Sequence, residues 1–146
     1  MNCQDVMTPS PVCCVPDDNV VDVARMMRSQ DIGAIPVVAD RSSERLVGMV
    51  TDRDLAVRVI AEGRDPRETA VRDVMSMQPV TCRDTDVYQQ ALQAMGEHQL
   101  RRIPVVDAGG RLAGIIAQAD VATRLAQPST TGAVVEAISE PGSSSR

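Results

Sequence analysis

Aromatic side chains are almost absent from this 146-residue chain, which has no tryptophan, no phenylalanine and one tyrosine. A hydrophobic core must therefore be built from aliphatic side chains, alanine and methionine, and the length allows one domain of ordinary size. No apolar run approaches the roughly 20 residues of a membrane span. The first residues also lack the basic and then apolar pattern of a secretion signal. We therefore expect a cytoplasmic protein.

The chain also lacks a basic surplus and the usual patterns of metal and catalytic sites. Its net charge is −5, which argues against non-specific binding to nucleic acid or to an anionic membrane. The four cysteines form no C-x-x-C pair and His98 is the single histidine, so the sequence argues against a structural zinc site. No pairing of a nucleophile with a base is visible. We expect no catalytic residues, no metal ligands and no enzymatic activity.

The chain contains an internal repeat of one sequence pattern. Ile35–Val38 returns as Ile103–Val106, and Leu46–Val50 returns as the similar run Leu112–Ile116. The offset falls from 68 to 66 residues between these two pairs, in a turn where a change of length is tolerated. Shorter matches agree: Asp5-Val6-Met7 with Asp73-Val74-Met75, Pro11-Val12 with Pro79-Val80, Cys14 with Cys82, and Asp54 with Asp120.

Each half predicts the element order β-α-β-β-α, from apolar residues at helical spacing and short apolar runs between turns. We expect Asp18 and Asp86 to cap the first helices, and Gly63 to follow the end of the helix that closes the first half. The expected elements are extended segments at 12–15 and 80–82, helices near 19–30 and 86–98, strands at 35–38, 46–50, 103–106 and 112–116, and closing helices near 52–61 and 118–126.

Neither half alone could easily bury both its sheet and its helices. The sequence therefore predicts a mixed α+β fold, in which two β-α-β-β-α repeats pack with pseudo-twofold symmetry into one domain. The predicted organisation is repeat 1 at 5–62, a polar linker at 63–72, repeat 2 at 73–126, and a tail at 127–146 with a helix near 131–138 followed by disorder.

The segment Gly48–Leu55 indicates the end of a buried strand that runs into a helix start. Thr51 is a good N-cap, and Asp54 lies three residues later, as in a capping box. Amide groups at a helix start also suit an anionic ligand. From these residues alone, the pattern fits a helix cap and nothing more, or a ligand site.

Taken together, D-V-M, I-P-V-V and G-x-h-T-x-x-D, each in tandem, resemble a CBS-domain pair, also called a Bateman module. The resemblance covers about Asp5–Leu125, and no catalytic or transport domain is attached. The chain is thus similar to the small stand-alone CBS-pair proteins, including the bacterial hypoxic-response type. The resemblance implies a regulatory, non-catalytic module that binds adenosine-containing ligands in clefts between its repeats, and that forms a homodimer.

Carried onto this sequence, the resemblance implies a nucleotide site built by both repeats. Asp54 would accept from the ribose hydroxyls, Thr51 and the helix-start amides would donate to phosphate, and Arg102 of the other repeat would pair with phosphate. Gly48 would allow a close backbone approach. The remaining expected contacts are Arg53 and Arg101 near phosphate, Met49, Ile103 and Pro104 along the base, and Asp120 in the second cleft.

The second cleft lacks two of these groups, because Ala117 stands in the place of Thr51 and Ala34 in the place of Arg102. We therefore predict one competent nucleotide site per chain, the second being weak, empty or occupied by an uncharged nucleoside. The candidate ligands are AMP, ADP and ATP, and also S-adenosylmethionine or NAD(H). No cofactor is required, and the regulated partner protein is not named by the sequence.

Two other functions fit the same residues. One is a dimeric interaction module without a nucleotide, in which Thr51 and Asp54 only cap a helix. The other is a thiol-based redox or stress sensor, suggested by the equivalent positions of Cys14 and Cys82.

Overall fold

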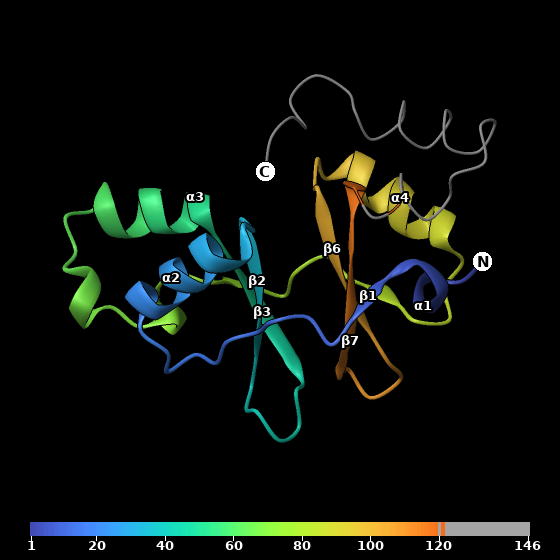
Figure 1. Cartoon of the computed structure of the whole chain (residues 1–146), viewed down its shortest axis with the longest axis horizontal. Helices are drawn as coiled ribbons and strands as arrows, with labels where there is room; N and C mark the ends of the chain where they lie inside the picture. Colours follow the sequence, from blue (N-terminus) through green and yellow to red (C-terminus); the bar gives the residue numbers. More distant parts are fainter. Residues whose placement is uncertain (120, 122–146) are drawn as a thin grey trace. The chain divides into compact units, whose positions relative to one another are not determined.

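The computed structural model describes residues 1–119 and 121, and the chain divides into two compact units (Figure 1). Unit 2 is the continuous segment Val12–Pro79. Unit 1 combines Met1–Pro11 with the chain from Val80 onward. Each unit has its own cluster of buried aliphatic, methionine and cysteine side chains, to which unit 1 adds Ala91 and Tyr88. The predicted mixed α/β class is confirmed, and so is the core almost without aromatic residues.

Unit 2 is a three-stranded antiparallel sheet in the order β2-β3-β4. Its strands are β2 (Ala34–Val38), β3 (Leu46–Thr51) and β4 (Ser76–Met77). Its helices are α2 (Val20–Gln30) and α3 (Asp52–Asp54), the latter continuing as the π-helix η1 (Leu55–Ile60). Both helices lie on the same side of the β2–β3 hairpin in Figure 1.

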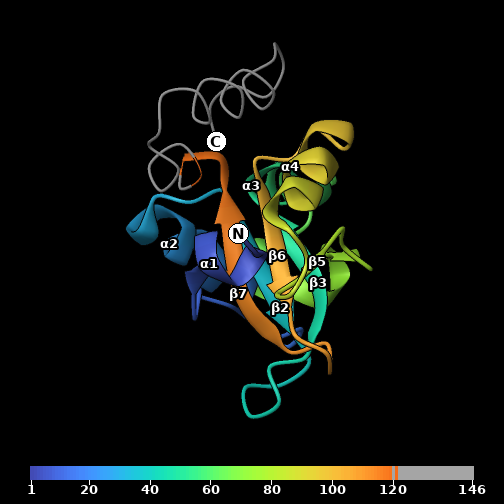
Figure 2. The same cartoon turned by 90° about the vertical axis from the view of Figure 1, so that its right-hand side faces the viewer.

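Unit 1 repeats this plan with a four-stranded sheet in the order β1-β7-β6-β5. Its strands are β1 (Thr8–Pro9), β5 (Cys82–Arg83), β6 (Arg102–Val106) and β7 (Leu112–Ala117). Its helices are α1 (Cys3–Val6) and α4 (Tyr88–Glu97). β6 and β7 run side by side in both views (Figures 1 and 2), as their antiparallel pairing requires.

The first segment of each sequence repeat pairs with a strand of the other half. β1 pairs with β7, and β4 pairs with β3. The predicted repeats are continuous in sequence, whereas the compact units exchange these segments, and the repeat boundaries stay a prediction. Two glycines permit the exchange, because a Cβ at Gly48 would lie 2.7 Å from the Ser76 carbonyl and one at Gly114 would lie 2.7 Å from the Thr8 carbonyl.

The predicted caps of the first helices are wrong by one residue in unit 2 and replaced by a turn in unit 1. Asn19 caps α2, its side chain accepting from the backbone amide of Val21 at 2.8 Å. Asp18 instead accepts from Val15 N at 3.0 Å. In the same way Asp86 accepts from Arg83 N at 2.9 Å, and α4 begins without a side-chain cap. Both aspartates stabilise the turn before the helix, because a short carboxylate bonds nearby amides readily.

Gly63 follows the closing helix of unit 2 closely, as predicted, but stands two residues after the C-cap Ala61 and not directly after it. Its φ is +72°, and its amide donates to Ile60 O at 3.1 Å. The linker that follows is polar but folded, with the 3₁₀ helices η2 (Pro66–Glu68) and η3 (Val71–Asp73). It packs on the start of α2, where the Asn19 side chain donates to Arg67 O at 2.8 Å.

No helix within residues 1–119 and 121 is long and apolar enough to cross a membrane. Most of the predicted helix 118–126 and the whole tail 127–146 lie outside the described residues.

Candidate ligand-binding site

A complete capping box joins β3 to α3 in unit 2. The Thr51 hydroxyl accepts from the Asp54 amide at 3.1 Å, and Asp54 Oδ2 accepts from the Thr51 amide at 2.9 Å. The predicted cap is therefore confirmed. The Asp54 side chain is 13% exposed. Its second oxygen, Oδ1, contacts Arg58 Nε at 3.8 Å, too far for a hydrogen bond. The cap thus uses one carboxylate oxygen and leaves acceptor capacity on the other.

Arg58 is a residue of this site that the sequence analysis missed. Besides its contact with Asp54, its Nη1 donates to Val74 O at 3.1 Å and to Met75 O at 3.4 Å. The signal was its position four residues after Asp54, the spacing at which opposite charges meet on a helix. Arg58 therefore connects the capping carboxylate to the segment that leads into β4.

The corresponding corner of unit 1 has different chemistry on the same backbone. In unit 2 Ala34 pairs with Thr51 across the β2–β3 hairpin, and in unit 1 Arg102 pairs with Ala117 across the β6–β7 hairpin. Next to Arg102, one guanidinium nitrogen of Arg101, Nη1, is shielded from solvent and has no hydrogen-bond partner among the described residues. An unsatisfied buried donor of this kind favours an acceptor, and a guanidinium favours an anion.

The structure places the other predicted residues as follows. Arg53 is exposed, and Met49 is half-buried on β3. Ile103 and Pro104 are buried in unit 1, with Ile103 in its hydrophobic core. Asp120 lies outside the described residues. Thr51 and Asp54 come together within unit 2 and Arg101 to Pro104 within unit 1, and a site that uses both sets stays a prediction.

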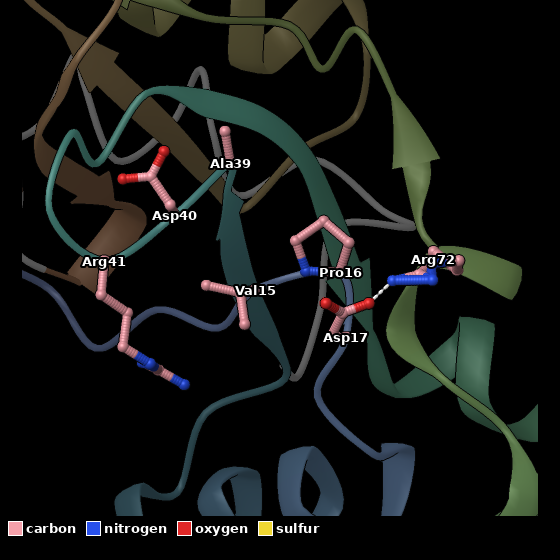
Figure 3. A pocket seen from close by; sticks show the side chains of 7 residues that line it. All are labelled: Val15, Pro16, Asp17, Ala39, Asp40, Arg41 and Arg72. Atoms are coloured by element: carbon pink, nitrogen blue, oxygen red, sulfur yellow. Dashed lines mark ion pairs between the residues drawn. The ribbon is translucent and has the colours of Figure 1, made fainter.

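A cavity of about 390 Å³ lies in unit 2 at the other end of β2, beside the hairpin turn (Figure 3). The sequence analysis did not anticipate it. Figure 3 shows Arg72 directed at Asp17, with which it forms an ion pair. Arg41 pairs with Asp18 at 2.9 Å, and the backbone amide and side chain of Ser43, with Ser42, lower the pKa of Asp40 to about 2. The charged side chains that line the cavity thus already have partners, since Asp17 and Arg72 pair with each other, and Arg41 and Asp40 pair with residues outside the lining.

The four cysteines are all free thiols. Cys14 and Cys82 occupy equivalent places, with their thiols directed at the carbonyls of Pro36 and Pro104 at 3.7 and 3.9 Å. Burial raises the pKa of Cys14 to about 12 and raises that of Cys82 as well. They lie in different units, and the thiol beside Cys82 belongs to Cys3 instead.

Two halves with the same hairpin, helix and glycine positions define a tandem-repeat module. The chain belongs to the CBS domain family, whose sequence profile matches residues 3–60 and 71–127.

Several relatives are similar over most of their length. The CBS domain-containing protein YhcV of Bacillus subtilis is 37% identical over 136 residues, which cover 93% of this chain and 94% of that protein. Hypoxic response protein 1 of Mycobacterium tuberculosis is 37% identical over 123 residues, covering 84% and 83%. The resemblance to a stand-alone CBS pair of the hypoxic-response type is thereby confirmed.

Solved structures agree. The crystal structure of Hypoxic Response Protein I, with two coordinated zinc ions, aligns with a TM-score of 0.76 at 33% identity and covers 84% of this chain and 98% of that one. The structure of CBSX2 from Arabidopsis thaliana in complex with AMP aligns with a TM-score of 0.75 at 28% identity, covering 88% and 98%. Within residues 1–119 and 121 of the present chain, no three His, Cys, Asp or Glu side chains are placed to hold a metal ion.

Proposed function

We propose that this chain is a non-catalytic regulatory module that binds an adenosine-containing nucleotide in the cleft between its CBS repeats. Occupancy of the cleft would shift the population of conformations that a partner protein recognises. AMP, ADP and ATP are the first candidates, followed by S-adenosylmethionine and NAD(H).

The observation that carries the proposal is the capping box of Thr51 and Asp54. The box uses Oδ2 of Asp54, so the other carboxylate oxygen, Oδ1, can accept a hydrogen bond from a ligand. A ribose diol offers two hydroxyl donors to such a carboxylate, in charge-assisted hydrogen bonds. The Thr51 amide, which donates to Asp54 Oδ2 at 2.9 Å, holds the carboxylate in place before the ligand arrives, and the 3.1 Å bond from the Asp54 amide to the Thr51 hydroxyl fixes the backbone beside it. The orientation of the carboxylate therefore costs little entropy on binding.

The basic pair Arg101–Arg102 supplies the complementary charge. The unpartnered Nη1 of Arg101 supports a phosphate ligand, because a bound anion would satisfy a donor that is otherwise buried at a cost. The AMP complex of CBSX2 supports the same ligand class, since that protein shares 28% of its aligned residues with this chain.

A thermal-shift panel with AMP, ADP, ATP, S-adenosylmethionine and NADH tests the proposal. At about 100 times Kd a ligand adds roughly 2.7 kcal/mol, which is on the order of 5–10 °C in Tm for a chain of this size. Asp54→Asn should abolish the shift, because it keeps an oxygen for the cap but removes the charge.

Asp73→Asn is a matched control for that variant. Asp73 is also the third residue of its turn, and it accepts from the Ala70 amide at 3.4 Å. The Asp73→Asn variant should therefore show the same ligand-induced rise in Tm as the wild type. No shift with any of the five ligands would contradict the proposal.

We propose further that the chain forms a homodimer through η1. Val57 and Ile60 are 45% and 67% exposed on this helix, and large exposed apolar side chains favour an interface. Sedimentation should show a dimer that Ile60→Asp converts to a monomer. This arrangement would be contradicted if the wild-type protein were a monomer both at high concentration and after 50-fold dilution. A dimer that binds no nucleotide would favour the interaction module.

A further inference from the structure

Two thiols that are 79 residues apart in sequence share the core of unit 1. Cys3 opens α1 and is fully buried, while Cys82 opens β5 and is 6% exposed. Their hydrogen bonds run to backbone carbonyls, from Cys3 Sγ to Val87 O at 4.0 Å and from Cys82 Sγ to Pro104 O at 3.9 Å. Both side chains belong to one buried cluster, and each thiol perturbs the pKa of the other as a neighbour within hydrogen-bonding reach. The sulfur atoms are therefore neighbours in the folded chain.

Backbone hydrogen bonds on both sides hold this contact. The Cys3 amide donates to Asp86 O at 2.8 Å, and the Gln4 amide donates to Asp84 O at 3.1 Å. The acceptors belong to the turn that directly follows β5. Met1 O accepts from the Tyr88 amide at 3.0 Å, so the N-terminal segment is attached along the whole turn.

The other two cysteines have no such partner. Cys13 and Cys14 are adjacent residues of unit 2, and Cys14 directs its thiol at Pro36 O. Side chains of adjacent residues in an extended segment point in opposite directions, which keeps the two sulfur atoms apart. Only Cys3 and Cys82, among the four thiols, combine burial in one core with mutual contact.

We propose that Cys3 and Cys82 are a modification site, at which a hydroperoxide converts the two thiols into an intramolecular disulfide. The Cys3 thiolate attacks the peroxide, the O–O bond breaks, and with H₂O₂ a sulfenic acid and one water form after proton transfer. The Cys82 sulfur then attacks the Cys3 sulfur, the S–O bond breaks, and a second water leaves. The thiols lose two electrons and two protons, and the peroxide is reduced.

Access limits the rate of the first step. Burial raises the pKa of both thiols, so the closed structure holds little thiolate. α1 has only four residues, so its local opening requires few backbone hydrogen bonds to break. Oxidation therefore begins at Cys3 in the open form, and the disulfide forms when α1 closes on β5. The product fixes α1, and with it β1, to the sheet of unit 1.

Peptide mapping of the full-length protein tests this site. The protein is treated with H₂O₂, its remaining thiols are alkylated in denaturant, and its mass is compared with that of an untreated sample. Peptides are then produced by cleavage before aspartate, which cuts before Asp5 and so separates Cys3 from Cys13 and Cys14. We expect two of the four thiols to be lost, a mass lower by about 2 Da before alkylation, and a cross-linked peptide pair containing Cys3 and Cys82, all reversed by dithiothreitol.

Oxidised protein should also melt at a Tm higher by about 5–10 °C, because the cross-link closes a long loop. Cys13→Ser, a half-buried control, should leave the cross-link unchanged, whereas Cys3→Ser should abolish it. Four intact thiols, oxidation to sulfinic acid without a cross-link, or a bond to Cys13 or Cys14 would overturn the proposal. The mapping uses the wild-type chain, so it stays decisive if a cysteine variant fails to fold.

Discussion

The β2–β3 hairpin of unit 2 and the β6–β7 hairpin of unit 1 have the same backbone and different chemistry. Both are antiparallel, both have an irregularity before the last residue of their first strand, and both pair that strand's first residue with the second strand's last. At this corner unit 2 has Ala34 and Thr51, whereas unit 1 has Arg102 and Ala117. The same backbone plan thus carries a hydroxyl and a carboxylate at one corner and a cation at the other.

The largest effect should come from removing the charged group at either corner. Asp54→Ala and Arg102→Ala are each expected to weaken nucleotide binding by about 100-fold or more, since a hydrogen bond to a charged group contributes about 1.5–3 kcal/mol and each side chain would make more than one. Isothermal titration calorimetry measures the change. Equal binding by Asp54→Ala and wild type would break the comparison, because the carboxylate would then only cap a helix.

The reverse exchange sharpens the same comparison. Ala34→Arg with Ala117→Thr gives each corner the groups that it lacks, and we expect this double variant to bind a second nucleotide per chain. Calorimetric stoichiometry checks it. A value unchanged from the wild type would show that side chains beyond these two set the asymmetry.

The next effect concerns the glycines, where the units should behave alike. Gly48→Ala and Gly114→Ala would each bring a Cβ to 2.7 Å from a backbone carbonyl, so both should lower the free energy of unfolding by about 1–3 kcal/mol. Gly96→Ala is the control. A Cβ at this α4 glycine would meet no neighbouring group within 4 Å, so the variant should be more stable than the wild type. Urea denaturation gives the free energies of unfolding of the three variants. A Gly48→Ala variant as stable as the wild type would contradict the close approach of β4 to β3.

A smaller effect is expected from the hydroxyl of the cap. Thr51→Val keeps the shape but leaves the Asp54 amide without its acceptor, at a cost of about 1 kcal/mol. Thr51→Ser should preserve stability. Thermal unfolding of both variants measures this difference, and a Val variant as stable as wild type would mean that water replaces the cap.

The smallest effect is shared by the buried thiols of both units. Burial raises the pKa of Cys14 from 9.0 to about 12, so the unfolded chain loses this proton at a lower pH than the folded chain. The contribution of the buried thiol to the free energy of unfolding is therefore present below about pH 9 and is lost as the pH rises toward 12. At pH 9.5 the loss is below about 1 kcal/mol per thiol. Unfolding curves for Cys14→Val and wild type should diverge only above pH 9, and parallel curves up to pH 11 would contradict the burial of this thiol.

Sequence patterns predicted the repeated elements well, because aliphatic periodicity reports local structure directly. The strands at Ile35–Val38 and Leu46–Val50 extend by one residue each in the structure, and the Thr51 cap is as expected. These features depend on residues that are close together in the chain.

What the sequence could not predict depends on contacts across the chain. Asn19 rather than Asp18 caps α2, because the Asn19 side chain also donates to Arg67 O, 48 residues away. The exchange of β1 and β4 between units and the contact of Cys3 with Cys82 have the same origin. Neither propensity nor spacing encodes which distant segment completes a sheet.

The most direct test of the account is the stoichiometry of AMP binding to the full-length chain by isothermal titration calorimetry. We expect one nucleotide per chain in the wild-type protein and none in Asp54→Asn. Two equal sites per chain would contradict the asymmetry of the two hairpin corners, and an absence of binding would contradict the nucleotide site itself.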